Sequence, residues 1–186
     1  MNKTRNFRQL GNFLLLGGIL LFVYIYYPLA LLYFVPHKID PELKKQGFVI
    51  EIPKIKTESQ IIENVDAFNR SIYDQALEKG IAHAENSKLP GENGTIFLFA
   101  HSSGPPWNQT RHNTVFLKLG KLETGDIVTI YRKGKKFNYS VREKKEVWPG
   151  EVNYLLDTKK DQLILQTCTP IGTDLKRLLV FADPIK

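Results

Sequence analysis

The segment Leu163-Ile164-Leu165-Gln166-Thr167-Cys168-Thr169-Pro170 carries the only cysteine of the 186-residue chain at the end of an apolar run. A second apolar run, Arg177-Leu178-Leu179-Val180-Phe181, follows it and begins with a cation. Short apolar runs bounded by turn-forming residues are typical of buried strands. We therefore expect one strand over 162–168 that ends at Cys168 and a closing strand that begins at Arg177.

A third apolar run upstream, Thr95-Ile96-Phe97-Leu98-Phe99-Ala100, leads to His101. A thiol near its ordinary pKa is mostly protonated at neutral pH, so a nucleophilic cysteine needs a base or a nearby cation. Acyl transfer also needs positive charge directed at the oxyanion of the tetrahedral intermediate. The candidate catalytic residues are therefore Cys168 as nucleophile, His101 as acid and base, and Arg177 as oxyanion stabiliser.

Each candidate also has a structural interpretation that these residues alone leave open. A lone cysteine on an apolar strand is often a small buried hydrophobe, a histidine after a strand is often structural, and Arg177 could be a surface cation. Among the other histidines, His112 in the polar loop is the second choice for the base. His37 lies in a linker and His83 lies among alanines, so neither is preferred.

Composition limits the classes of protein that fit. The length allows one folded domain and one extra segment, and 42% hydrophobic with 24% charged residues is ordinary for a globular domain. A single cysteine excludes an intrachain disulfide and a thiolate zinc cluster. Acidic residues are too scattered for a calcium site, so we expect no metal and no cofactor. The net charge of +7 suits an anionic partner.

The N-terminal part of the chain predicts a membrane anchor. Residues 13–35 contain no charge, which is enough for a helix that crosses the bilayer. The run is too long for a cleavable signal peptide and lacks the polar face of a buried core helix. Three basic residues precede it, so residues 1–12 are expected in the cytoplasm and residues 36–47 form a linker outside. The single folded domain is then 48–186, and the protein is a single-pass membrane protein.

Strand patterns dominate this domain. We expect strands over 48–53, 126–131 and 137–148 in addition to those above, and short helices over 61–79 and 115–119. Antiparallel barrels and sandwiches have this composition of elements. The basic hairpin over 131–139 alternates cations with aromatic residues, as single-stranded nucleic-acid sites do. Its expected location outside the cytoplasm favours a solvated hairpin, so we expect no nucleic-acid partner.

The motifs around the candidate residues resemble the sortases, membrane-anchored cysteine transpeptidases of bacteria. The resemblance rests on His101-Ser102, the segment Leu165-Gln166-Thr167-Cys168-Thr169-Pro170-x-Gly172, and Arg177-Leu178-Leu179-Val180. It implies a mainly β fold, a closed barrel of about eight strands with short helices, after one transmembrane helix. It also implies that Thr167 and Thr169 bind substrate and that the loop 148–161 walls the groove.

The same resemblance implies the reaction. The cysteine would attack the Thr-Gly bond of an LPXTG-like sorting signal at the C-terminal end of a secreted protein. An amine would then resolve the acyl-enzyme, either a cell-wall precursor or another protein subunit. The loop 102–112 is longer than the family's usual turn, no N-terminal lid is evident in 36–46, and the motifs suit pilus-type and housekeeping-like classes alike.

Two other functions remain open on these residues. A membrane-anchored cysteine peptidase would release the same acyl-enzyme to water. A non-enzymatic anchored β-domain would bind anionic surface polymers and keep Cys168 in its core.

Overall fold

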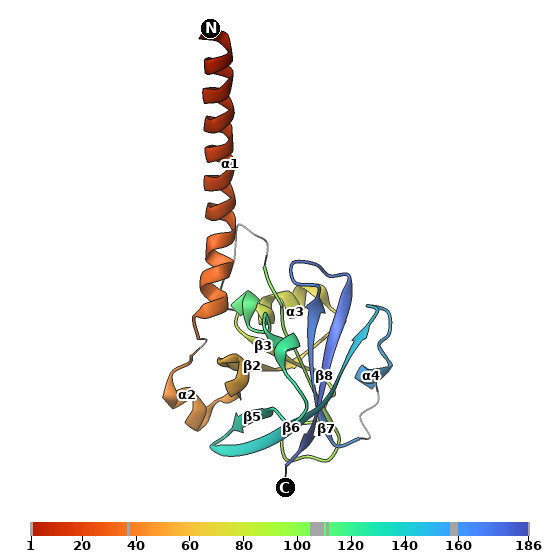
Figure 1. Cartoon of the computed structure of the whole chain (residues 1–186). Helices are drawn as coiled ribbons and strands as arrows, with labels where there is room; N and C mark the ends of the chain where they lie inside the picture. The colour runs from red at the N-terminus through yellow and green to blue at the C-terminus, as the bar shows by residue number, and fades with distance from the viewer. Residues whose placement is uncertain (1, 37, 105–109, 111, 157–159, 186) are drawn as a thin grey trace.

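The computed structural model describes residues 2–36, 38–104, 110, 112–156 and 160–185. In this part of the chain a long N-terminal helix leads into a closed β-barrel (Figure 1). The strand order around the barrel is β1-β2-β3-β4-β7-β8-β6-β5. The strands are β1 Phe48–Ile52, β2 Thr57–Val65, β3 Ile81–Ala84, β4 Thr95–Phe99, β5 Ile127–Arg132, β6 Lys135–Val147, β7 Gln162–Thr169 and β8 Lys176–Pro184. The helices are α1 Asn2–Phe34, α2 Pro41–Gln46, α3 Arg70–Leu77 and α4 Asn153–Leu156, with 3-10 turns η1 Pro53–Ile55, η2 His112–Thr114 and η3 Leu119–Lys121.

The expected fold class, a mainly β closed barrel after an apolar helix, is confirmed. The pairing differs from a purely antiparallel barrel because β2 pairs with β3, and β4 with β7, in parallel. All five residues of β4 and the first four of β7 are buried. Strands that are covered on both faces read as continuous apolar runs, as these do. The same runs that marked the candidate site therefore form the centre of the barrel.

Of the short helices expected over 61–79 and 115–119, the first range contains one α-helix, α3, and the second contains none. Residues 61–65 belong to β2, in which Thr57, Ser59 and Ile61 are buried at alternate positions. The range 61–79 therefore contains two elements, the end of β2 and the helix α3. Asn69 caps α3 by accepting a hydrogen bond from Ile72 N at 3.4 Å. Residues 115–118 form turns between η2 and η3, and η3 includes Gly120.

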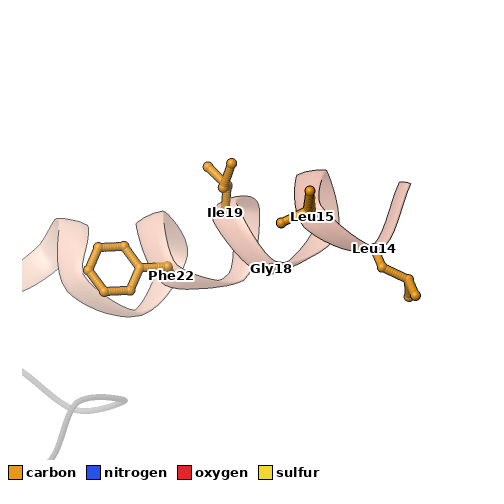
Figure 2. A pocket seen from close by; sticks show the side chains of 5 residues that line it. All are labelled: Leu14, Leu15, Gly18, Ile19 and Phe22. Carbon is orange, nitrogen blue, oxygen red and sulfur yellow. The ribbon is translucent and has the colours of Figure 1, made fainter. Parts of the chain in front are cut away.

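Helix α1 contains a segment, Phe7–Phe34, that is long and apolar enough to cross a membrane, with an 18-residue window whose mean hydropathy is 2.1. Leu14, Ile19 and Phe22 project from it around Gly18 (Figure 2). After α1, the linker carries α2, which Lys44 joins to Glu51 at 3.0 Å and to Glu58 at 2.9 Å. The expected linker is therefore held against β1 and β2; His37 within it lies outside the described residues.

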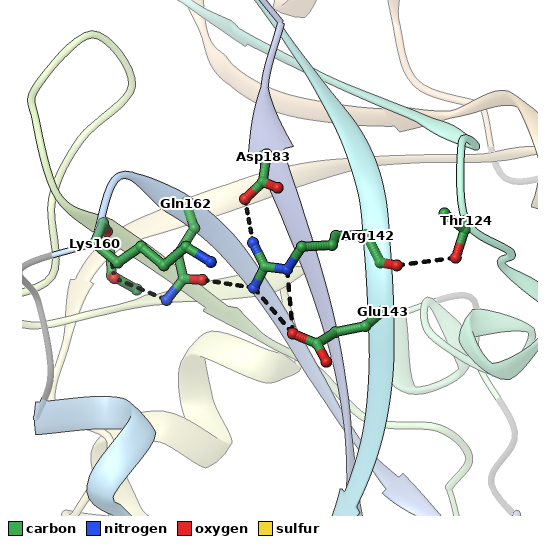
Figure 3. A network of polar contacts seen from close by, with 7 residues as sticks. Thr124, Arg142, Glu143, Lys160, Gln162 and Asp183 are labelled. Atoms are coloured by element: carbon green, nitrogen blue, oxygen red, sulfur yellow. Dashed lines mark hydrogen bonds and ion pairs between the residues drawn. The ribbon is translucent and has the colours of Figure 1, made fainter.

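Arg142 joins three neighbouring strands at the end of the barrel where β7 begins (Figure 3). Its guanidinium contacts Asp183 of β8 and donates to Gln162 Oε1 of β7 at 3.2 Å. Arg142 lies on β6 where the register with β8 shifts between Val141 and Glu143. Such a shift weakens the backbone ladder locally, so the side chain supplies the connection between strands.

Replacing Arg142 by glutamine is expected to lower the free energy of unfolding by about 1–2 kcal/mol, because several charge-assisted hydrogen bonds are lost together. Denaturant unfolding of the full chain in detergent, followed by tryptophan fluorescence, measures the change. The matched control is Arg70→Gln, whose ion pair with Asp74 is solvent-exposed. The control should cost at most about 0.5 kcal/mol. Equal effects of the two variants would contradict the role of Arg142 in closing the barrel.

Candidate active site

The parallel pairing of β4 with β7 brings His101 alongside Cys168. Phe99 pairs with Gln166, and Ala100 N donates to Gln166 O at 3.1 Å. The Thr167 hydroxyl then donates to Ala100 O at 2.9 Å. These contacts continue the register by one more residue, so the next positions on the two chains are His101 and Cys168. Both side chains are half-buried.

The antiparallel pairing of β7 with β8 places Arg177 directly opposite Cys168. Because β4, β7 and β8 are neighbours in the barrel, the three candidate residues are brought together at one end of three adjacent strands. The loops that follow are also joined, since Gly172 N donates to Ser103 Oγ at 2.9 Å. The arrangement therefore comes from the backbone of the barrel.

His101, Cys168 and Arg177 line one cleft of about 1320 Å³. Pro149, Val152 and Tyr154 line it too, in agreement with the expectation that the loop 148–161 walls the groove. Another wall comes from the segment before α3, from α3 itself and from the C-terminal third of α1. A cleft of this size suits an extended peptide of a few residues better than a single small molecule.

Burial sets the protonation of the two reactive groups. Burial raises the pKa of the Cys168 thiol, while the nearby Arg177 lowers it and Asp174 raises it by smaller amounts. Burial likewise lowers the pKa of His101, and Asp74 acts in the opposite direction. Both shifts favour the neutral forms. A thiol and a neutral imidazole therefore predominate near pH 7, and the thiolate–imidazolium pair is a minor state.

The pH dependence of thiol alkylation tests this electrostatic balance. The rate at which iodoacetamide modifies Cys168 in the full chain is expected to rise with pH, with a midpoint above that of an ordinary thiol. In Arg177→Gln the midpoint should move further up, because removing a cation disfavours the thiolate. Lys176→Gln is the control, since Lys176 pairs with Glu146 at 3.3 Å. An Arg177→Gln midpoint that stays in place or falls would show that the guanidinium does not act on the sulfur.

Arg177 is fixed through one end of its guanidinium. Nη1 donates to Asp174 O at 2.9 Å and to Lys176 O at 3.3 Å. Within the described residues, the hydrogen bonds of the guanidinium are made by this one nitrogen. A planar fork that is held by one nitrogen can direct its other N–H groups elsewhere, which an ammonium cannot do while keeping the same contacts. This geometry favours a role in which the side chain is pre-oriented.

Arg177→Lys is therefore expected to lower kcat/KM by about 100-fold, the magnitude found for loss of one oxyanion donor. The change in kcat/KM would be measured from peptide cleavage rates at peptide concentrations well below KM. Activity of Arg177→Lys equal to that of the unmodified chain would assign Arg177 to the surface. A normal thermal midpoint for the variant is required, because it excludes misfolding as the cause.

The other expected site residues lie in different surroundings. Thr167 lines the cleft but is only 4% exposed, and its hydroxyl donates to Ala100 O, just after β4. Thr169 pairs with Lys176 and lies outside the set of described residues that line the cleft. His112 lines the cleft but is exposed. His83 is buried in β3, where Nδ1 accepts a hydrogen bond from Asn64 N at 3.3 Å.

Sequence reasoning missed three residues of the cleft. Tyr154 of α4 donates to Gln166 Oε1 at 2.9 Å and stacks on Phe97 with ring centroids 5.9 Å apart. Gln166 interrupts an apolar strand two residues before Cys168, so the alternation of the strand could have placed both on the same face. Asp74 of α3 carried no such signal, because its place in the cleft depends on how α3 packs.

The cleft that contains Cys168 therefore lies at one end of a closed, mainly β barrel. The Sortase domain family model matches residues 50–185, which is most of the chain. The chain therefore belongs to the sortase family, as its motifs suggested. Members of the family are membrane-anchored cysteine transpeptidases that act on proteins with sorting signals and on pilin subunits.

Individual relatives agree with this assignment. Sortase D of Bacillus subtilis (strain 168) is 33% identical over 149 residues, which cover 78% of this chain and 67% of the relative. A Clostridium perfringens Sortase D5 transpeptidase is similar in structure, with a TM-score of 0.60, 27% identity, and coverage of 80% and 91% of the two chains. The pilus-related Sortase C of Group B Streptococcus gives a TM-score of 0.63, 28% identity, and coverage of 76% and 68%.

Proposed function

We propose that this sortase cleaves an LPXTG-like sorting signal through a thioester on Cys168 and transfers the protein to an amine. The observation that carries the proposal is the register that sets Cys168 opposite Arg177 and beside the end of β4 that leads to His101. The amine is a cell-wall precursor or a protein subunit. The proposed substrate-binding residues are Thr167, which lines the cleft, and Thr169.

The first half-reaction forms the acyl-enzyme. The Cys168 thiolate attacks the threonine carbonyl carbon, and the tetrahedral oxyanion is stabilised by the Arg177 guanidinium. The C–N bond to glycine then breaks, and the His101 imidazolium gives its proton to the leaving amine. The products are a thioester on Cys168, a neutral imidazole and the released C-terminal fragment.

The second half-reaction reverses the proton movement. The acceptor amine attacks the thioester carbonyl while neutral His101 takes a proton from the amine. The C–S bond breaks, and a new amide and a free Cys168 thiolate are formed. The enzyme returns to the thiolate–imidazolium state, so the cycle consumes no cofactor.

The test uses the full chain in detergent micelles with a panel of LPXTG-like peptides and an excess of triglycine. Mass spectrometry is expected to find the peptide cut after threonine and joined to triglycine. It should also find a thioester on Cys168 that hydroxylamine removes. A cut peptide with a free carboxylate at every amine concentration would instead identify a peptidase. No cleavage, together with a thiol that resists labelling, would favour a non-enzymatic domain.

We also propose that α1 anchors the domain on the outer face of the membrane. Lys3, Arg5 and Arg8 precede the apolar segment, and basic flanks stay in the cytoplasm. This assigns 1–12 to the cytoplasm, 13–35 to the anchor, 36–47 to the linker and 48–186 to the catalytic domain. Cys168 is the only cysteine of the chain. A membrane-impermeant maleimide should therefore label this protein when it is added to intact cells. Labelling only after permeabilisation would reverse the orientation.

A further inference from the structure

The last turns of α1 are partly covered by the barrel, whereas the earlier turns are exposed. From Phe7 to Tyr24 every residue is exposed, but Ile25, Leu29, Leu32 and Tyr33 are half-buried. This spacing of four, three and one residues places the half-buried side chains on one face of the helix. The covered face therefore extends over nine residues, 25–33, about 12 Å along the helix.

The covered face of α1 also forms part of the candidate active-site cleft. Ile25, Tyr26 and Leu29 line the same cleft as Cys168. Phe68, in the turn before α3, lines it too and is 70% exposed. The position of Phe68 is set by its backbone, because Phe68 N donates to Asp66 Oδ1 at 2.8 Å. A large apolar side chain thus lies exposed on the rim that faces the anchor.

The length of the span fixes the depth of this rim. The candidate membrane span Phe7–Phe34 has 28 residues and includes Arg8 near its start, whereas about 20 helical residues fill a hydrocarbon layer of roughly 30 Å. Wherever that window falls, Ile25 lies inside it and Leu29 lies inside it or within about 5 Å of its edge. The headgroup layer is about that thick. Leu29 therefore lies between about 5 Å outside the hydrocarbon edge and about 8 Å inside it, so the rim that shares a cleft with it lies at the boundary between acyl chains and headgroups.

Charges next to the same turns of α1 suit a lipid surface. Lys118 and Lys121 place Nζ over the Tyr33 ring, 5.8 Å and 4.8 Å from its centroid. The Arg70 side chain, on the rim beside Phe68, is 85% exposed. Asp74 and Glu78 line the cleft as well, and Asp74 pairs with Arg70 at 3.4 Å. Attraction to anionic headgroups therefore rests mainly on Lys118 and Lys121. Aromatic and basic side chains together are typical of protein surfaces at the bilayer interface.

We propose that the Phe68 rim of the cleft seats in the phospholipid headgroup layer of the leaflet from which the C-terminal end of α1 emerges. The cleft then opens along the membrane surface, and the membrane forms the boundary of its α1 side. The proposal rests on the membrane span proposed for α1. It does not depend on which peptide or which amine the enzyme uses.

Depth-dependent fluorescence quenching tests the proposal on the full chain. Single cysteines are introduced by Phe68→Cys, Leu29→Cys or Ile185→Cys in a Cys168→Ala background and labelled with an NBD dye. The proteins are reconstituted in phosphatidylcholine–phosphatidylglycerol vesicles that contain lipids with a nitroxide near the headgroup. Ile185 is the matched control, because it is also a large exposed apolar residue, 47% exposed, near the C-terminus at the opposite end of the barrel (Figure 1).

The expected result is strong quenching at positions 29 and 68, at least threefold greater than at position 185, with blue-shifted emission at 68. Quenching at 29 with none at 68 would overturn the proposal and leave the membrane span intact. Absence of quenching at 29 would overturn both. Equal thermal midpoints of the three labelled proteins show that the labels leave the fold intact, and Ile72→Cys, on the first turn of α3, repeats the test if Phe68→Cys fails to fold.

Discussion

Replacing Cys168 by alanine is expected to abolish sorting-signal cleavage, with kcat/KM reduced by at least about 10⁴-fold. The sulfur is the atom that forms the thioester, and neither His101 nor Arg177 supplies a nucleophile in its place. The loss should fall on kcat, because the cleft that holds the peptide is built by many other residues. The unfolding midpoint should change little, since the thiol is half-buried and its removal deletes one atom.

The measurement is single-turnover cleavage of a quenched fluorescent sorting peptide, with peptide binding followed separately by fluorescence anisotropy. The informative control is a second substitution at the same site, Cys168→Ser, which keeps a hydroxyl of similar shape. We expect both variants to bind the peptide and neither to form a thioester. Turnover by Cys168→Ala above the rate of the uncatalysed reaction would remove the nucleophile assignment.

Replacing His101 by alanine is expected to reduce kcat/KM by about 10²- to 10⁴-fold, the usual range for a general acid and base. Without the imidazole, the leaving amine must depart without a proton donor and the acceptor amine must lose its proton to water. The second histidine of the cleft, His112, provides the matched comparison. It lines the same cleft but is exposed and lies beyond the β4–β7 register that aligns His101 with Cys168.

The histidine pair is compared across pH with the same peptide. Because the pKa of His101 is lowered by burial, the protonated imidazole is lost as pH rises through a value below that of an ordinary histidine. Since the pKa of Cys168 is raised, the thiolate appears only at alkaline pH. The unmodified chain and His112→Ala should share one bell-shaped profile, which His101→Ala should lack. An inactive His112→Ala beside an active His101→Ala would exchange their roles.

The position of the candidate site could be predicted from local sequence, because its residues lie at the ends of the most apolar runs. Strands β4 and β7 are buried on both faces, and such strands are marked by composition alone. Their parallel pairing was missed because no local signal states which strand lies next to which. The same limit applies to the hydrogen bond from Thr167 to Ala100, because it joins two segments that local sequence does not place side by side.

Residues whose position depends on packing could not be predicted. The apolar spacing of Ile62, Val65 and Phe68 suggested that helix begins near residue 61, although β2 ends at Val65 and α3 begins at Arg70. Tertiary pairing with β1 and β3 decides this boundary, and helix propensity is too weak to oppose it. The contact between the end of α1 and the cleft was missed for the same reason. An apolar helix marked as an anchor gives no sign that one of its faces meets protein.

The hydrogen bond from Thr167 to Ala100 joins residues 67 positions apart in the chain, and β5 and β6 lie between them. The loop that must close before His101 meets Cys168 therefore contains much of the barrel. Contacts of this sequence separation form late and slow the folding of β proteins. The thiol of a newly made chain accordingly lacks its histidine until the barrel has closed. Recovery of peptide cleavage after refolding should lag behind recovery of β-sheet circular dichroism. The return of enzymatic activity would then report when the last step of folding occurs.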